Sequence, residues 1–344
     1  MKAMVAPVPD HIERLDPNTL GVPPFEERWP WLGGDLQTLR NFLRRPQIDL
    51  SAFATERIEL PLDGASGDRT AAALHWPPGR NRRPLVLLVH GLTGSEDSTY
   101  MRATASALLR AGYPVLRLNQ RGAGSSRPFC RDRYHAGRSE DLARAIAELP
   151  ARVTAFGVVG VGYSLGGNVL LKYLGERGRD TPLSAAVAVS APLDLAVTCR
   201  SMMAPRNALY HRYFLGELRA ETLAAGGRLS PEEWRVVLAA RDIREFDDLV
   251  TAPRNGFAGA EDYYRRCSSA SFLAGIAVPT LLVQSEDDPI VPAAPFRAQE
   301  WRTKPCLVPL LLRRGGHVGF HDRRGGTWHD RAILSFFERA LSLS

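Results

Sequence analysis

One serine of the 344-residue chain stands where a strand pattern turns into a helix pattern. The stretch 158–174, VVGVGYSLGGNVLLKYL, begins with β-branched residues, continues with helix formers, and holds Ser164 between Gly162 and Gly166. A serine in this G-x-S-x-G pattern lies in a sharp turn that lifts its hydroxyl above a sheet, where it can attack a carbonyl carbon. The two glycines are needed because the neighbouring backbones come too close for a Cβ atom. The simpler alternative is that Ser164 only caps the helix.

A nucleophilic serine needs backbone N–H donors that hold the oxyanion formed by its attack. One donor is expected from Leu165, the residue after the serine, and the other from the loop after an earlier strand. The segment 85–95, LVLLVHGLTGS, ends a buried strand and offers Leu92 as this second donor. His90 in the same segment is interpreted as a structural histidine that orders the loop.

An acid and a histidine follow later in the chain. The segment 278–292, VPTLLVQSEDDPIVP, places Asp287 and Asp288 after an apolar strand; Asp288 is the first choice for the acid and Asp287 the second. The segment LLLRRGGHVGFHD offers His317 directly after two glycines, with His321 as the second choice. A histidine held by an acid can take the serine proton and return it to a leaving group. This order along the chain, serine before acid before histidine, is typical of an α/β-hydrolase triad.

Other chemistries are disfavoured by the sequence. The cysteines are far apart and form neither a disulfide framework nor a zinc motif: Cys130, Cys199, Cys267 and Cys306. A dinucleotide loop would need a third glycine where Leu165 stands. The formal charge is +7, but the arginines are scattered among acids, so nucleic-acid binding is not expected. We expect a reaction that uses neither a metal nor an organic cofactor.

The elements that must position these residues follow an alternating pattern. Two alternating segments near residues 56–62 and 69–76 are typical of a hairpin. Short apolar runs then alternate with helical patterns, such as those at 99–111 and 139–149, and predict a mostly parallel sheet with helices on both faces. The expected strands are 85–89, 115–118, 154–161, 185–189, 280–283 and 307–312.

This pattern predicts a domain organisation for the whole chain. Residues 1–55 are expected to form an N-terminal arm packed on the core, and residues 56–191 and 278–344 an α/β-hydrolase core. Residues 192–277 lack a strand run and are interpreted as a helical lid insertion over the carboxyl edge of the sheet, where ligands of open α/β sheets bind. The charged residues Arg244, Asp247 and Asp248 are expected to fasten this lid to the core.

The N-terminal segment MKAMVAPVPDHIERLD lacks the apolar centre of a signal peptide, and the longest apolar runs are too short to span a bilayer. A cytoplasmic protein without a transmembrane segment is expected. Peripheral membrane contact stays open, and the sequence favours no particular oligomeric state.

Several longer motifs together resemble one known family. They are LGGDLQTL, HGLTGS, GYSLGGN, EDDPIVP, GGHVGF and REFDDLVTAPRNGFAGAEDYYRRCSS. With them the chain resembles the YheT-like family of α/β-hydrolases, which is related to eukaryotic abhydrolase-domain lipid hydrolases. The resemblance implies carboxylic-ester hydrolysis, with Ser164 as nucleophile, His317 as general base and acid, and Asp288 as the acid. The sequence departs from the family pattern at Asp35, a position where members of the family commonly have histidine.

A serine ester hydrolase that acts on small-molecule or lipid esters through an acyl-enzyme is therefore the predicted function. Two alternatives stay open at this point. One is an acyltransferase that makes esters from an alcohol acceptor, and the other is a non-catalytic ligand-binding protein on the same fold.

Overall fold

The computed structural model describes residues 21–63, 66–79, 82–224 and 229–342, and its centre is one β-sheet. The strands are β1 (Ala54–Pro61), β2 (Arg69–Trp76), β3 (Leu85–Val89), β4 (Val115–Leu118), β5 (Val158–Tyr163), β6 (Leu183–Val189), β7 (Thr280–Ser285) and β8 (Leu307–Leu312). Their order across the sheet is β1-β2-β4-β3-β5-β6-β7-β8. Strand β2 runs antiparallel to β1 and β4, and the other neighbouring pairs are parallel. The predicted mostly parallel sheet is confirmed.

Helices precede the first strand, occupy connections between strands and follow the last strand. They are α1 (Gly34–Arg44), α2 (Thr99–Arg110), α3 (Ser139–Ala147), α4 (Ala151–Thr154), α5 (Leu165–Arg177), α6 (Leu195–Met202), α7 (Ala208–Leu223), α8 (Pro231–Ala239), α9 (Ile243–Phe246), α10 (Ala252–Arg254), α11 (Ala260–Cys267), α12 (Ala294–Arg297) and α13 (Trp328–Ser342). Short 3-10 segments are Gly124–Phe129, Gly178–Asp180, Pro205–Asn207, Ser269–Gly275 and Trp301–Thr303, and a π-helical turn spans Asp247–Thr251.

The central strands are apolar because both faces of the sheet are covered. Every residue of β3, β5 and β7 is buried, which explains their continuous apolar sequence. One hydrophobic cluster joins the sheet to α3 and α5, and a second joins its other face to α2 and α13. These two layers hold the strand ends, and with them the loops that follow, in fixed positions.

One predicted strand begins later than its sequence indicated. The run 154–161 was expected to be extended from Thr154, but Ala151–Thr154 form the short helix α4 and the strand starts at Val158. The chain reverses between them at Gly157, whose φ of +90° suits a residue without a Cβ. Thr154, although β-branched, therefore belongs to helix α4 and not to strand β5.

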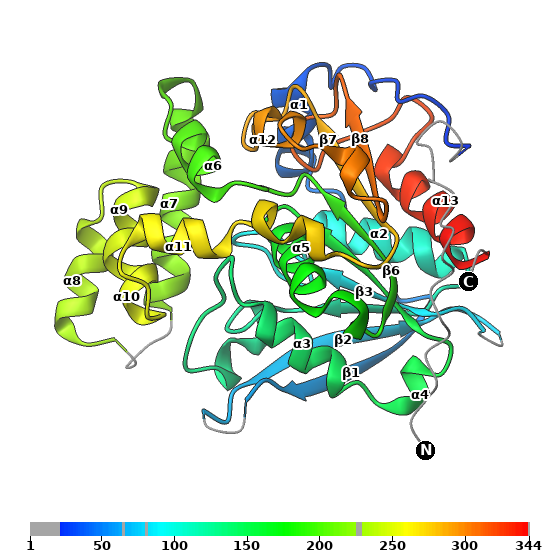
Figure 1. Cartoon of the computed structure of the whole chain (residues 1–344), viewed down its shortest axis with the longest axis horizontal. Coiled ribbons are helices and arrows are strands. Elements are labelled where there is room, and N and C mark those ends of the chain that lie inside the picture. Colours follow the sequence, from blue (N-terminus) through cyan, green and yellow to red (C-terminus); the bar gives the residue numbers. More distant parts are fainter. Residues whose placement is uncertain (1–20, 64–65, 80–81, 225–228, 343–344) are drawn as a thin grey trace.

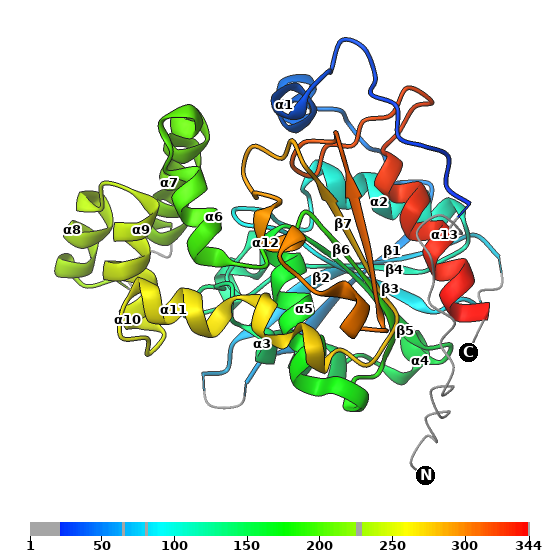
Figure 2. The same cartoon turned by 45° about the horizontal axis from the view of Figure 1, so that its top comes forward.

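Between β6 and β7 the described residues form helices joined by short turns, and no strand is found among them. Figures 1 and 2 show α7 to α11 gathered to one side of the sheet, connected to it through α6 and α11. This segment has its own hydrophobic cluster, which includes Phe246 and Tyr264 and also contacts Leu165 at the start of α5. That residues 192–277 act as a lid stays a prediction.

The arm contributes α1, which lies beyond the ends of β7 and β8 in both views (Figures 1 and 2). Its first residue, Gly34, packs directly against the backbone of Asp287, which follows β7. Residues 1–20 of the predicted arm lie outside the described residues. All four cysteines are free. A bilayer-spanning helix would need a longer and more apolar stretch than any helix in the described ranges provides.

Candidate active site

Ser164 occupies the turn between β5 and α5. Its φ of +49° and ψ of −122° are unusual for a residue with a side chain, and such a conformation costs about 1–3 kcal/mol. The backbone is held there because the Ser164 N–H donates to the Val189 carbonyl at 2.8 Å, continuing the pairing of β5 with β6. Within the described residues the Ser164 side chain makes no capping hydrogen bond to α5, so its hydroxyl is left for other partners.

The glycines around the serine allow this close approach. A Cβ on Gly162 would lie 2.5 Å from the Gly166 carbonyl oxygen, and a Cβ on Gly166 would overlap the carbonyl oxygens that end β3. A Cβ on Gly91 would lie 3.0 Å from the Ser164 Cβ. The loop after β3 and the turn after β5 therefore touch each other through backbone.

The structure brings Ser164, His317 and Asp288 into one hydrogen-bonded chain. His317 Nε2 lies 2.9 Å from the Ser164 Oγ, and His317 Nδ1 lies 2.8 Å from the Asp288 Oδ2. Because an ionised carboxylate can only accept, Nδ1 carries the proton and Nε2 is left to accept from the serine hydroxyl. The His317 side chain keeps 10% of its surface exposed, whereas the Asp288 side chain has none.

The two candidate acids have different partners. Asp288 Oδ1 accepts from the amides of Ile290 and Val291, both at 2.8 Å, which fixes the carboxylate and leaves Oδ2 for His317. Asp287 Oδ1 instead accepts from the Gly316 amide at 3.0 Å. The first-choice acid therefore contacts the histidine ring, and the second-choice acid contacts the backbone before it.

The expected oxyanion donors lie beside the serine. Leu165 is the first residue of α5, so its N–H has no acceptor within the helix. Leu92 lies in the loop after β3, and within the part of the chain that the structure describes its N–H donates to no other residue. Leu92, Ser164 and Leu165 line the same cavity. Two unpaired backbone donors next to a nucleophile are the arrangement that an oxyanion hole requires.

His90 holds the loop that carries Leu92. Its ring is fully buried, Nδ1 donates to the Gly91 carbonyl at 2.8 Å, and Nε2 accepts from the Gln120 amide at 3.0 Å. Burial lowers the pKa of His90 to about 4, so the ring is neutral at physiological pH. One ring nitrogen therefore bonds within the loop, and the other bonds to the backbone after β4. This agrees with the structural role expected from the sequence.

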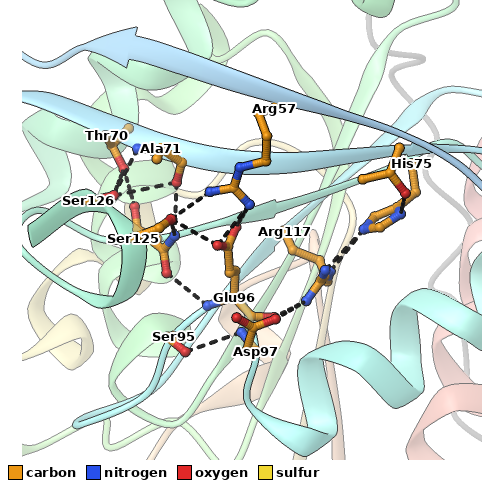
Figure 3. Close-up of polar contacts among 12 residues, drawn as sticks. Arg57, Thr70, Ala71, His75, Ser95, Glu96, Asp97, Arg117, Ser125 and Ser126 are labelled. Atoms are coloured by element: carbon orange, nitrogen blue, oxygen red, sulfur yellow. Dashed lines mark hydrogen bonds and ion pairs between the residues drawn. The ribbon is translucent and has the colours of Figure 1, made fainter. Parts of the chain in front are cut away.

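A polar cluster fixes the far end of the same loop to the sheet (Figure 3). Glu96 is buried and accepts two hydrogen bonds of 2.8 Å from Arg57 of β1 and one of 2.9 Å from Ser125. Arg117 of β4 donates to the Glu96 carbonyl and to the ring of His75, a residue of β2. The loop between β3 and α2 is thus tied directly to β1 and β4, and through Arg117 to β2. None of these contacts was expected from the sequence.

The arm holds the loop that carries the histidine. The Thr38 hydroxyl of α1 accepts a 2.8 Å hydrogen bond from the His317 amide and donates one of 2.6 Å to the Gly34 carbonyl. Gln37 is fully buried, accepts the His321 amide at 2.6 Å and donates to the His321 carbonyl at 3.2 Å. Neither Thr38 nor Gln37 was predicted from the sequence as part of the site, although both belong to the motif LGGDLQTL.

His321, the second-choice histidine, lies apart from the nucleophile. Its ring is buried beside Arg40, and burial followed by the charge of Arg40 lowers its pKa to about 3. Among the described residues, hydrogen bonds connect His321 to Arg28, Gln37 and Arg40, and none connects it to Ser164.

A mostly apolar cavity opens at Ser164. Its wall comes from the loops after β3, β6 and β7 and from helices α6, α7, α9 and α11, and includes Leu195, Met202, Phe214 and Ile243. Such a wall accepts a hydrocarbon chain. Within the described ranges, no three His, Cys, Asp or Glu side chains are arranged to hold a metal ion.

Comparisons with known proteins show the family to which the chain belongs. A family profile for the alpha/beta hydrolase fold matches residues 84–323. YheT of Escherichia coli (strain K12), assigned by its name to the esterases, is 36% identical over 296 residues, which are 83% of this chain and 83% of YheT. The human phospholipase ABHD3 is 26% identical over 322 residues, which are 90% of this chain and 77% of that protein.

Among solved structures, an esterase of Pyrococcus furiosus matches with a TM-score of 0.58 at 18% identity, covering 84% of this chain and 92% of its own. That likeness shows the fold, while the sequence relatives show the family. The chain belongs to the esterase- and lipase-type α/β-hydrolases, and within them to the YheT-like family related to eukaryotic abhydrolase-domain lipid hydrolases.

Proposed function

We propose that the protein hydrolyses carboxylic esters of small molecules or lipids through an acyl-enzyme formed on Ser164. The observation that carries this proposal is the chain of hydrogen bonds from Ser164 through His317 to Asp288. Relatives named as an esterase and as a phospholipase support ester substrates, and the apolar cavity at the serine supports an alkyl group on one side of the ester.

The proposed reaction proceeds in two halves. His317 Nε2 takes the Ser164 proton while the Oγ attacks the ester carbonyl, and the Leu92 and Leu165 amides bind the resulting oxyanion. As the intermediate collapses, the proton passes from His317 to the departing alcohol, leaving the acyl group on Ser164. A water molecule then repeats these steps, with His317 as its base, and releases the acid. Asp288 holds the ring in the required tautomer throughout.

The helices of residues 192–277 are proposed to act as a lid. They supply most of the cavity wall, so access to Ser164 depends on their position. Peripheral contact with a lipid surface belongs to the same proposal, because a lid of this kind meets the substrate first.

A fluorophosphonate probe tests the nucleophile directly. The wild-type protein should be labelled on the peptide that contains Ser164, and the folded Ser164→Ala variant should not be labelled. Absence of labelling in folded wild-type protein would favour a non-catalytic binding protein.

Product analysis in water–alcohol mixtures identifies whether water or an alcohol accepts the acyl group. A hydrolase should release mainly free acid, and the share of new ester should not exceed the share of alcohol in the solvent. Ester formed far above that share would identify an acyltransferase.

A further inference from the structure

One acidic side chain lines the otherwise mostly apolar cavity that contains Ser164. Asp247 begins the π-helical turn Asp247–Thr251 between α9 and α10, and part of its surface is accessible. Among the residues that the structure describes, no arginine, lysine or histidine lines this cavity. π-helical turns are rare and often occur at functional sites.

The carboxylate of Asp247 is held by neutral donors. Oδ1 accepts from the Thr251 hydroxyl at 2.8 Å, and Oδ2 accepts from the Tyr264 hydroxyl at 2.7 Å. Over the described ranges of the chain, no cationic side chain forms an ion pair with it. These two bonds leave part of its accepting capacity free, because a carboxylate has about four lone-pair sites.

The expected role of this residue as a fastener of the lid to the core is wrong. Arg244 pairs with Glu261, and Asp248 accepts the Ala260 amide, so these side chains join parts of the helical segment to each other. The partners of Asp247 also belong to that segment. Its position in the cavity therefore has no explanation in the attachment of the lid.

An acid in such surroundings is unfavourable unless something compensates its charge. Burial raises the pKa of Asp247 to about 6, against the effect of its two hydrogen bonds. The group is still largely ionised at neutral pH, and a hydrophobic residue of similar size would avoid the desolvation cost. A ligand that brings a hydrogen-bond donor into the cavity would supply the missing compensation.

We propose that Asp247 recognises a hydrogen-bond donor, a hydroxyl or a protonated amine, on the part of the substrate ester that enters this cavity. The inference rests on the proposed function, since it takes the cavity at Ser164 as the substrate site. The apolar wall accommodates the hydrocarbon part, Ser164 meets the ester carbonyl, and Asp247 binds the polar end. The preferred substrate class is thus an ester with a polar terminus and not a plain alkyl ester.

Matched esters of equal length, ending in a methyl, a hydroxyl or an ammonium group, test this inference. The polar end is placed first on the acyl side and then on the alcohol side. Wild-type protein should favour at least one polar-ended ester over its methyl counterpart by about tenfold or more in kcat/KM, as expected for a hydrogen bond to a charged group. The hydroxyl and ammonium series show which donor is preferred.

Asp247→Asn is the informative variant, and Asp248→Asn, one residue away, is its control. Asp247→Asn should lose most of the preference for the polar end, most strongly for ammonium, while Asp248→Asn keeps the wild-type ratio. Equal preference in wild type and Asp247→Asn would overturn the inference. Melting curves of both variants check that they are folded.

The pH dependence of the substrate ratio separates recognition from a structural role. Both esters use the same Ser164 and His317, so effects of pH on the triad cancel in the ratio. The preference for ammonium over methyl should rise with pH through about 6 as Asp247 ionises. A ratio that does not change with pH contradicts recognition by this carboxylate.

Binding to the Ser164→Ala variant gives an answer that does not need turnover. Calorimetric titration with the same ester pairs should show tighter binding of the polar-ended ester, and the further change Asp247→Asn should remove the difference. If no ester is hydrolysed by wild type but this difference persists, the proposed function fails and the recognition site stands. If esters are hydrolysed and bound without preference, only the recognition site fails.

Discussion

The backbone amide of His317 donates a 2.8 Å hydrogen bond to the hydroxyl of Thr38, which lies 279 residues earlier in the chain. The loop around the histidine is thus positioned by α1 as well as by the strand before it. Gly316 also packs against Gln37 and Thr38, and a Cβ at Gly316 would lie 2.8 Å from the Thr38 Oγ1. The N-terminal arm is consequently a support for the candidate active site.

Replacing Thr38 should affect the reaction more than substrate binding. Thr38→Val removes the acceptor of the His317 amide, and leaving such a group unpaired typically costs about 1–3 kcal/mol. We expect kcat to fall by roughly tenfold with little change in KM, and Thr38→Ser to restore it because the hydroxyl returns. Steady-state kinetics and melting curves of both variants check this. Equal kcat for Thr38→Val and wild type would exclude the positioning role.

The two neighbouring acids should differ sharply in their effect on activity. Asp288→Asn removes the charge next to His317 Nδ1 and favours the wrong tautomer, and we expect a loss of kcat of about 10⁴-fold, the order known for such a change in a serine triad. Asp287→Asn keeps an oxygen that can accept the Gly316 amide and should lose less than about tenfold. The measurement is kcat on one soluble ester. A larger loss for Asp287→Asn would reverse the assignment of the acid.

The polar cluster at Glu96 should contribute to stability. Glu96→Ala breaks the contacts with Arg57 and Ser125, and we expect the free energy of unfolding to fall by about 1–3 kcal/mol. Glu59→Ala on the same strand as Arg57 is the control, because Glu59 pairs with Arg69 at the surface and should change stability by less than about 1 kcal/mol. Urea unfolding of both variants checks the difference. Equal losses would show that the cluster is no more important than a surface pair.

Stability should fall as the pH falls below about 6.5. Burial lowers the pKa of His75 to about 4, with Arg117 adding to the effect, and lowers those of His90 and His321 to about 4 and 3. In the unfolded chain these rings bind protons near pH 6.5, whereas in the folded chain they resist protonation. The free energy of unfolding is therefore highest above about 6.5 and decreases as the pH falls toward 4 and 3.

Urea midpoints measured across this range test the direction. His75→Gln keeps an acceptor for Arg117 and removes one titrating ring. The urea midpoint of this variant should therefore fall less steeply between pH 6.5 and 4 than the midpoint of the wild-type protein. A variant that declines as steeply as wild type would contradict the contribution of His75.

The sequence was most informative where the structure depends on local chemistry. The buried strands are continuous apolar runs, and the serine turn needs glycines at fixed offsets, so both could be located from neighbouring residues. Asp288 and His317 could be proposed as acid and histidine because each follows a strand and the fold limits their order along the chain.

Contacts between distant segments could not be predicted in the same way. The roles of Thr38 and Gln37 depend on where α1 packs, and nothing near them in sequence specifies a partner 279 or 284 residues away. Likewise, the place of Asp247 in the cavity depends on how the helices after β6 fold over Ser164. A charge in a helical segment looks the same in the sequence whether it faces solvent or a cavity.

The nucleophilic role of Ser164 is tested most directly by the release of p-nitrophenol from p-nitrophenyl esters of increasing chain length, with wild type beside Ser164→Ala. We predict turnover by the wild-type protein and none above background by the folded variant, with a chain-length preference set by the apolar cavity. Equal rates for the two proteins would contradict this prediction, because Ser164 would then be a turn residue and not the nucleophile.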